Sequence, residues 1–223
     1  MTQSVDLANA INSFVKGCKT DGTWDAIKAC CIMAAWDGLD GALYPLKGPA
    51  PTNNNFVSGD YNRETGLTQL PGDGKYLDTN QISDSTPDES HHFSVYRTAG
   101  NLTTQGQTLL KADDNNCMFI SNSSVRFAIR FNPSQVTNGS FGGPMLIGAS
   151  RNGATAVVFR KSNTNYNYSK TLTGGSSSTY LFLGGSGGIG QTQSFYSIGE
   201  SIDLALLDNR VSTLMTDIGA AIP

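Results

Sequence analysis

Nine short segments with the composition of β-strands follow one another between Tyr76 and Gly199. Each has about five to eight residues, and clusters of Gly, Asn or Ser separate them. They read YLDTN, HHFSVYRT, CMFISN, VRFAIRF, GPMLIGAS, AVVFRKS, YNYSKTL, TYLFLGG and SFYSIG. Many short strands at this spacing pair in antiparallel sheets, so they predict a mainly β fold, an antiparallel β-sandwich with helices only at the two ends of the chain.

The N-terminal part of the chain has the spacing of an amphipathic helix. Leu7, Ile11 and Phe14 recur at helical steps, Ser4 is available as an N-cap, and Gly17 is the predicted end. A short second turn is predicted around Trp24 and Ile27, so short N-terminal helices are expected. The later stretch ACCIMAAW predicts a buried strand, because no polar residue interrupts it.

A second amphipathic helix is predicted near the C-terminus. Ser201 is its expected N-cap, and Asp203 in the first turn favours the positive end of the helix dipole. Apolar residues recur at steps of three and four and make one stripe: Leu204, Leu207, Val211, Leu214 and Ile218. We expect this stripe to close the core of the sandwich. The alternative is a coiled-coil seam, although the stripe lasts only about two heptads.

The length of the chain fits one β-rich domain. At 223 residues it can bury a sizeable core. We expect residues 1–30 to form an N-terminal helical arm packed on the sandwich, and residues 31–223 to form the sandwich closed by the C-terminal helix. Gly, Pro and Asn dominate residues 37–75, which predicts a long irregular segment with a few short strands embedded.

Charge and hydropathy exclude several classes of partner. The formal net charge is -3, the sequence pI is near 5.2, and charged residues make up 15%. No stretch gathers the Lys and Arg needed to neutralise a row of phosphates, so we expect no nucleic acid partner. No apolar stretch approaches the roughly 20 residues that cross a bilayer, so we expect no membrane insertion. The first residues do not have the pattern of a secretory signal peptide.

The chain has four cysteines and two histidines, and these are the residue types most often found in reactive or metal sites. Cys18, Cys30, Cys31 and Cys117 lack the spacing of a zinc site, so buried free thiols are expected; the alternative is a disulfide that includes Cys18 or Cys117. Neighbouring residues of a strand point to opposite faces, so His91 and His92 cannot chelate one ion together. We expect them to be ordinary strand or rim residues.

Two polar clusters could bind a ligand or simply fix a loop. The first is KADDNNC, in which Asp113, Asp114, Asn115 and Asn116 offer oxygen atoms of the kind that calcium prefers, although such a cluster is also a turn signal. Calcium is the one ion that the sequence leaves open as a ligand.

The second polar cluster is SGDYNRETGL, which contains Asp60, Arg63 and Glu64. It is either a polar ligand-binding loop or an arginine held between two carboxylates that fixes the loop. With Tyr61, these residues are expected to stabilise the long irregular segment.

Four stretches of the chain are informative when they are taken together and in this order: INSFVKGCKTDGTWDAIKACCIMAA, PLKGPAPTNNNFVSGDYNRETGL, KYLDTN and FYSIGESIDLALLDNRVSTLMTDI. Together they resemble a family of tailed-phage virion proteins, whose pattern is a helix, a TDG.W turn into a strand, a YN...GL loop, K.YLDTN and a terminal SIGESL helix. The resemblance covers about residues 9–80 and 193–220, and the middle of the chain matches only by strand pattern.

The resemblance implies a concanavalin A-like, laminin-G-type jelly roll in an exposed virion component, often the end of a tail fibre. It implies a virion location, other virion proteins as partners, and a homotrimer or higher homo-oligomer. It transfers no catalytic residue, cofactor or obligate metal ligand. Family members usually carry this domain at the end of a longer chain, whereas here the family pattern starts within the first residues. Direct decoration of a capsid, collar or baseplate is therefore expected as well as a fibre role.

The leading hypothesis is a non-enzymatic structural protein of a phage particle that acts through protein–protein packing. The alternative is a carbohydrate-binding receptor module for a host-surface glycan, because the same sandwich hosts lectins. Tyr166, Tyr168 and Phe141 are its candidate stacking residues, with Arg63 as a polar contact, although strand tyrosines also pack across strands. A third hypothesis is a polysaccharide hydrolase with two carboxylates across a cleft, but the strands are poor in Asp and Glu.

Overall fold

The computed structural model describes residues 2–70, 72–100, 107–121, 124–131, 135–138, 143–174, 178–184 and 191–222. Its helices and strands, in chain order, are α1 (Thr2–Thr20), β1 (Ile27–Ile32), α2 (Leu39–Ala42), β2 (Pro45–Lys47), β3 (Thr52–Asn54), η1 (Ser58–Asp60), β4 (Tyr61–Asn62), β5 (Gly66–Gln69), β6 (Tyr76–Ile82), η2 (Ser83–Ser85), β7 (Ser90–Gly100), β8 (Gln107–Asp113), β9 (Asn116–Ser121), β10 (Ser124–Ile129), β11 (Gln135–Asn138), β12 (Met145–Asn152), β13 (Ala156–Lys161), β14 (Thr164–Ser169), β15 (Thr179–Gly184), β16 (Gln191–Gly199) and α3 (Leu204–Ala221).

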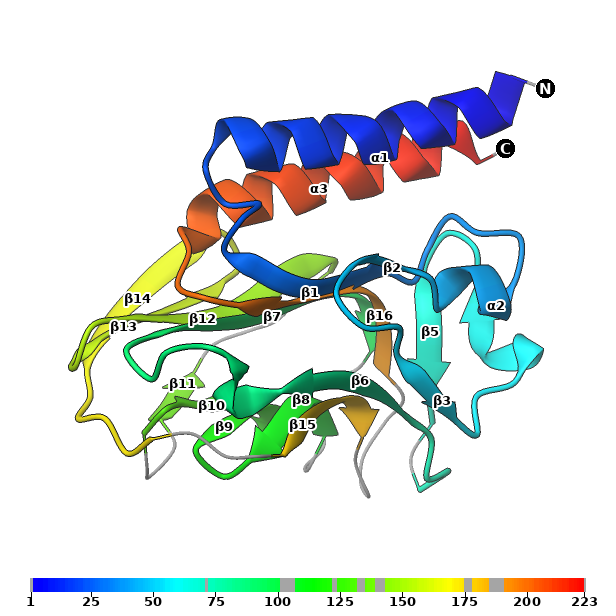
Figure 1. Cartoon of the computed structure of the whole chain (residues 1–223). Helices are drawn as coiled ribbons and strands as arrows, with labels where there is room; N and C mark the ends of the chain where they lie inside the picture. The colour runs from blue at the N-terminus through cyan, green and yellow to red at the C-terminus, as the bar shows by residue number, and fades with distance from the viewer. Residues whose placement is uncertain are drawn as a thin grey trace.

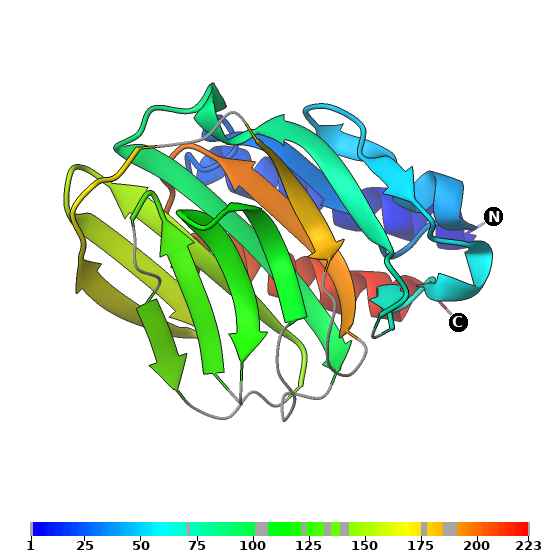
Figure 2. The ribbon, with the colours of Figure 1, turned by 90° about the horizontal axis from the view of Figure 1, so that it is seen from below.

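Two antiparallel sheets face each other, and a pair of helices covers the outer face of one of them (Figure 1). The larger sheet has nine strands, with the path β14-β13-β12-β7-β16-β1-β2 and with β5 and β4 added beside β16. The smaller sheet has seven strands in the order β11-β10-β9-β8-β15-β6-β3, and it faces the viewer in Figure 2. The predicted antiparallel β-sandwich with terminal helices is confirmed.

The N-terminal region forms one long helix instead of short ones. Helix α1 continues past Gly17 to Thr20, so the predicted stop is wrong. A Cβ atom on Gly17 would lie 2.7 Å from Nε of Arg210 in α3, and Arg210 itself pairs with Asp21 at 2.7 Å. The glycine is therefore a point of close approach between two helices and not a helix end. The domain boundary expected at residue 30 falls inside β1.

The segment between β1 and β6 is largely irregular with a few short strands, as predicted. Between residues 37 and 75 the chain forms one four-residue helix, one 3-10 turn and four strands of two to four residues. In Figure 1 this segment lies at one end of the sandwich, on the side where both termini are found.

The first core lies between the two sheets. Aromatic side chains from both sheets meet there: the rings of Phe127 and Phe159 stack at 4.2 Å between centroids, and Phe182 packs against Tyr196 at 5.3 Å. Cys31 and Cys117 belong to this core. Burial raises the pKa of the Cys31 thiol to about 12 and that of Cys117 to about 11, so neither is a thiolate at neutral pH.

The second core lies between the helix pair and the larger sheet. Four residues of the predicted stripe of α3 are buried here: Leu207 and Val211 are fully enclosed, and Leu214 and Ile218 are nearly so. Leu204, at the start of the stripe, is also buried. Opposite them stand residues of α1 and of the sheet, including Phe14, Cys18, Cys30 and Phe195. The stripe therefore packs on a face of the sandwich, as predicted, and it also packs on α1, which was not predicted. All four cysteines are buried and form no disulfide.

The N-cap of α3 is Asp203 and not Ser201, which corrects the sequence prediction. The Asp203 carboxylate accepts hydrogen bonds from the backbone N–H of Ala205 at 2.7 Å and of Leu206 at 3.3 Å. Ser201 lies too early for this role, because the helix begins at Leu204; its own N–H donates to Oγ of Ser90 at 3.0 Å.

His91 and His92 point to opposite faces of β7, as predicted, but both are fully buried and neither lies at a rim. His91 lies between the sheets, where its ring nitrogens bond the hydroxyls of Thr86 and Tyr180. His92 lies on the helix side, and its Nδ1 bonds the Glu200 carbonyl, so this nitrogen carries the proton. Burial lowers the pKa of His91 well below its usual value and that of His92 to about 4.

We expect the buried stripe to dominate the stability of α3. Leu207→Ala should lower the free energy of unfolding by about 2–5 kcal/mol, because it removes a fully enclosed side chain. The neighbouring Leu206 is 37% exposed, so Leu206→Ala should cost less than about 1 kcal/mol. Urea unfolding of both variants measures the difference, and equal losses would contradict the assignment of the two faces.

The two histidines should make the protein less stable in mild acid. Below pH about 6.5 the unfolded chain takes up protons on both rings, whereas the folded chain takes none on His92 until about pH 4. Stability should therefore fall on going from pH 7 to pH 5, by up to about 1.4 kcal/mol per pH unit for each histidine. In His92→Gln the slope should shrink by about half; a wild-type curve that is flat over this range would refute the prediction.

Candidate functional site

A groove of about 460 Å³ lies on the outer face of the larger sheet, beside the start of α3. We call it the α3 groove and define it by its lining residues, which are Ser150, Asn152, Ala156, Val158, Asn165, Ser201, Ile202, Asp203 and Leu204. Its volume lies within the range of small-molecule sites, which is about 300–1,000 Å³. Most of its polar side chains are uncharged amides and hydroxyls.

The floor of the α3 groove follows from strand alternation in β13. Val157 and Phe159 point inward to the core, so Ala156, Val158 and Arg160 share the outer face. Helix α3 packs on β12 and β13, while Asn165, Asn167 and Ser169 on the outer face of β14 are exposed. The outer face of the sheet is therefore covered by the helices at its centre and accessible toward its β14 edge.

The wall of the groove is the short connection from β16 to α3, and hydrogen bonds fix its position. Oγ of Ser150 donates to the Ile202 carbonyl at 3.0 Å and accepts from the Ile202 N–H at 3.1 Å. Asp203 is held by its cap bonds to α3. This wall is thus tied to β12 on one side and to the helix on the other.

The end of the groove near Ala156 is held by a buried arginine. Arg151 is fully enclosed, and its guanidinium donates to backbone carbonyls of separate segments: Ile129 at 3.0 Å, Ala154 at 2.9 Å and Lys170 at 3.1 Å. Burial lowers its pKa, yet an arginine stays charged in proteins. These bonds fix the turn that leads from β12 into the floor of the groove.

A buried polar network lies next to the groove, beneath α3. Arg160 pairs with Asp208 of α3 at 2.6 Å, and their side chains are 7% and 2% exposed. Arg160 also donates through Nη1 to Oδ1 of Asn165 at 2.8 Å, and Ser212 donates to Asp208 at 3.2 Å. The network links the helix to β13 and β14, and it ends on a residue that lines the groove.

The chemistry that this groove offers is hydrogen bonding and not acid–base catalysis. Asp203 is the one titratable side chain among its lining residues, and one oxygen of that carboxylate caps α3. Hydrolysis of a glycosidic bond by the usual route needs two carboxylates that flank the bond. The arrangement therefore suits the binding of a neutral polar ligand, and the hydrolase hypothesis gains nothing from it.

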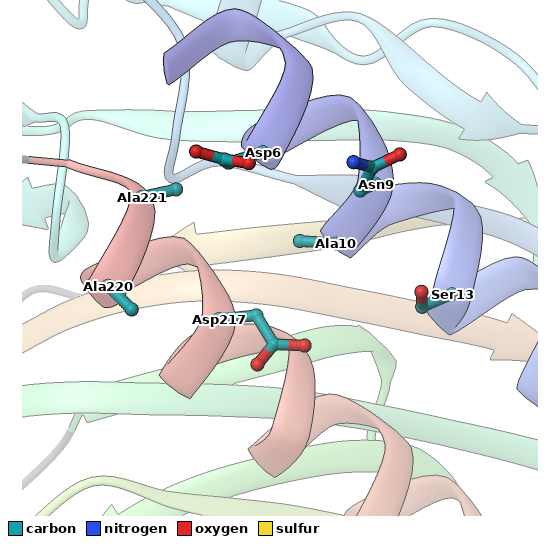
Figure 3. Close-up of a pocket in the computed structure, with 7 residues that line it drawn as sticks. All are labelled: Asp6, Asn9, Ala10, Ser13, Asp217, Ala220 and Ala221. Atoms are coloured by element: carbon teal, nitrogen blue, oxygen red, sulfur yellow. The ribbon is translucent and has the colours of Figure 1, made fainter. Parts of the chain in front are cut away.

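A second, shallower hollow of about 270 Å³ lies between α1 and α3 (Figure 3). Asp6, Asn9 and Ser13 of α1 line one side of it, and Asp217 and Ala220 of α3 line the other. These five residues are exposed. The hollow is a furrow between two packed helices, because small side chains at its floor leave the surface unfilled.

The predicted aromatic contacts do not gather in the α3 groove. Tyr166 and Tyr168 lie on the inner face of β14 and pack against the core between the sheets. The Tyr168 ring meets Phe127 edge-on at 5.4 Å, and Lys161 lies over the ring of Tyr166 at 5.6 Å. Phe141 lies outside the described residues. A role of the two tyrosines in ligand stacking stays a prediction.

Arg63 fixes a loop, but its partners are not the predicted ones. Its guanidinium donates to the Ala35 carbonyl at 3.0 Å and pairs with Asp37 at 3.2 Å. Asp60 pairs instead with Lys75 at 2.6 Å, and the Glu64 side chain is exposed. The expected arginine between Asp60 and Glu64 is therefore wrong, because the chain folds Arg63 back onto a distant segment.

Tyr61 also holds the long segment in place, because its hydroxyl donates a hydrogen bond to the Trp36 carbonyl at 2.6 Å.

The acidic turn of KADDNNC joins β8 to β9. Asp113 accepts hydrogen bonds from the N–H of Asn115 at 2.6 Å and of Asn116 at 3.0 Å, and Asp114 pairs with Lys111 at 2.9 Å. Over the described ranges, no group of three or more His, Cys, Asp or Glu side chains is placed to hold a metal. In the same part of the chain, no helix has the length and apolar character to cross a membrane.

No residue that lines the groove was predicted from the sequence as part of a ligand site. Ser201, Asp203 and Leu204 were singled out only for the start and the apolar stripe of α3. The stretch TNYNYS did carry a signal, because its tyrosines and asparagines alternate. If Tyr166 and Tyr168 pack inward, Asn165 must face outward. The approach of α3 to this edge of the sheet is a tertiary contact that no local pattern records.

No protein-family model matches the chain, and no curated protein sequence matches it. Solved structures do match at the level of the fold. The binding domain of botulinum neurotoxin serotype D matches with a TM-score of 0.60 and 12% identity, over 85% of this chain and 51% of that chain.

Two structures of the binding domain of botulinum neurotoxin DC match similarly. The complex with SialylT has a TM-score of 0.57, and the complex with rat synaptotagmin II has a TM-score of 0.58; both are 15% identical over 87% of this chain. The chain spans about half the length of these structures, 51% and 52%. At such identities the likeness shows the β-sandwich fold, and kinship with a phage protein family stays a prediction.

Proposed function

We propose that this chain is a non-enzymatic recognition module that binds a neutral, hydroxyl-rich ligand, such as a glycan of a host surface, in the α3 groove. The observation that carries the proposal is the groove itself, which is lined by amides, hydroxyls and small apolar side chains. Partly buried hydrogen bonds hold two of its lining residues in place, from Ser150 to Ile202 and from Arg160 to Asn165. Rigid, pre-formed polar groups of this kind bind a ligand without a large cost of ordering.

The fold supports this proposal. The three solved structures compared above are binding domains, and two of them were determined with SialylT and with rat synaptotagmin II. Those ligands belong to domains about twice as long as the matched region. The position of the ligand on this chain is therefore argued from the groove and not from the neighbours.

The sequence resemblance supplies the proposed setting. A module of this kind on a phage particle, as the exposed part of a fibre, capsid, collar or baseplate, would meet host glycans directly. A homotrimer would present three grooves in one direction and raise the avidity for a surface that carries many copies of the ligand.

A second candidate function is packing against another protein of the particle. Val57 and Leu70 are 59% and 56% exposed, and Lys75 pairs with a carboxylate in each of the two turns that carry them. The backbone N–H of Val57 donates to Asp60 and that of Leu70 donates to Asp73, while Lys75 lies 2.6 Å from Asp60 and 3.7 Å from Asp73. Exposed apolar side chains on fixed turns can take part in a protein contact without a large cost of ordering.

The packing function predicts that Val57→Ser together with Leu70→Ser should reduce incorporation of the chain into purified particles. The thermal unfolding midpoint should hardly change, because both side chains are exposed. Quantitative mass spectrometry of the particles measures incorporation. Wild-type levels of the double variant, or complete absence of the wild-type chain from particles, would count against this function.

The recognition function predicts that filling the groove abolishes binding. Ala156 is exposed on the floor, so Ala156→Trp should occupy the space of the ligand and weaken glycan binding by more than about tenfold. Ala8→Trp, at an exposed position of α1, is the matched control and should bind as the wild type does. Glycan-array screening followed by calorimetry tests this, and equal binding by both variants would place the ligand elsewhere.

A further inference from the structure

The hydrogen-bonding direction of one amide in the α3 groove is fixed by the fold. Asn165 and Arg160 are direct partners across β13 and β14, and their side chains share the outer face of the sheet. Arginine can only donate, so the atom of Asn165 that lies 2.8 Å from Nη1 of Arg160 is the amide oxygen. The Nδ2 group is then the end of the amide that is left to donate to a ligand.

The buried Arg160 side chain holds the Asn165 amide in this orientation. Arg160 cannot turn away, because it is 6% exposed and its Nε is paired with Asp208, which also accepts a bond from Ser212. Breaking a buried ion pair of this kind costs several times more than reversing an exposed amide. Asn165 therefore presents a donor of fixed direction, which an acceptor oxygen of a ligand can engage at that point.

The side chains around this donor restrict the class of ligand further. The apolar side chains of Val158 and Ala156 lie on the same strand face and on the floor of the same groove. On the opposite wall, Asp203 brings a carboxylate whose Oδ1 is engaged by the backbone of α3. The groove thus combines a donor, an apolar floor and a negative acceptor.

We infer that the α3 groove selects a neutral 2-acetamido sugar; this inference rests on the function proposed above. The acetamido carbonyl accepts from Nδ2 of Asn165, the acetamido methyl packs on Val158, and a ring hydroxyl donates to Asp203. A plain hexose lacks the carbonyl and the methyl group. An acidic sugar brings a carboxylate toward Asp203, which repels it.

Asn165→Asp is the variant that isolates this contact. The new carboxylate keeps an acceptor for Arg160, so the buried network and the fold persist, but the donor for the ligand is replaced by an acceptor. Asn12→Asp is the control, because Asn12 is exposed on α1 and does not line the groove, and the change in charge is identical.

The experiment is an NMR titration of the purified chain with the methyl glycosides of N-acetylglucosamine, glucose and glucuronic acid. We expect the wild type to bind the acetamido sugar about tenfold more tightly than glucose, and the acidic sugar most weakly. In Asn165→Asp the preference over glucose should fall to about one, whereas Asn12→Asp should keep it. Thermal unfolding midpoints verify that both variants are folded.

Three outcomes would overturn the inference, and they differ in what they imply for the proposed function. Equal binding of glucose and the acetamido sugar in the groove would refute the selectivity and leave the recognition function standing. An unchanged preference in Asn165→Asp would remove Asn165 from the contact. Absence of any sugar-induced shift in the groove would refute both the selectivity and the recognition function.

Discussion

The rest of the structure depends on a sheet that is buried on both faces. Strand β16 has nine consecutive buried residues, and neighbouring residues of β1, Cys30 and Cys31, belong to the two different cores. A two-layer sandwich buries only the inner face of each sheet, so the helix pair supplies the second cover. Removal of the apolar stripe of α3 would expose the centre of the larger sheet.

The same cover creates the α3 groove. Helix α3 begins over the sheet, leaves its outer β14 edge accessible, and is joined to that edge by Arg160 and Asp208. Burial of two charges is costly unless they are paired and hydrogen-bonded, and here each partner has a further bond, to Asn165 and Ser212. A network that is needed to seat the helix therefore also orients a side chain that faces solvent.

The sequence predicted those features that have a local period. Strand composition, the stripe of α3 and the opposite directions of His91 and His92 all follow from repeats of two or of 3.6 residues. Features that depend on distant partners were missed or wrong. Gly17 looked like a helix end but faces Arg210, and Arg63 bonds residues 35 and 37 instead of its sequence neighbours. The α3 groove is of this second kind, because strands β12, β13 and β14 meet the β16–α3 connection only after folding.

The central claim is that the accessible edge of the larger sheet, beside α3, is where this chain recognises a ligand. The most direct test is to map the backbone amide shifts of the labelled chain as a methyl glycoside of N-acetylglucosamine is added. The account predicts that the largest shifts fall on residues 156–158, 165 and 201–204. Shifts confined to residues 37–75, or to the furrow between α1 and α3, would contradict it.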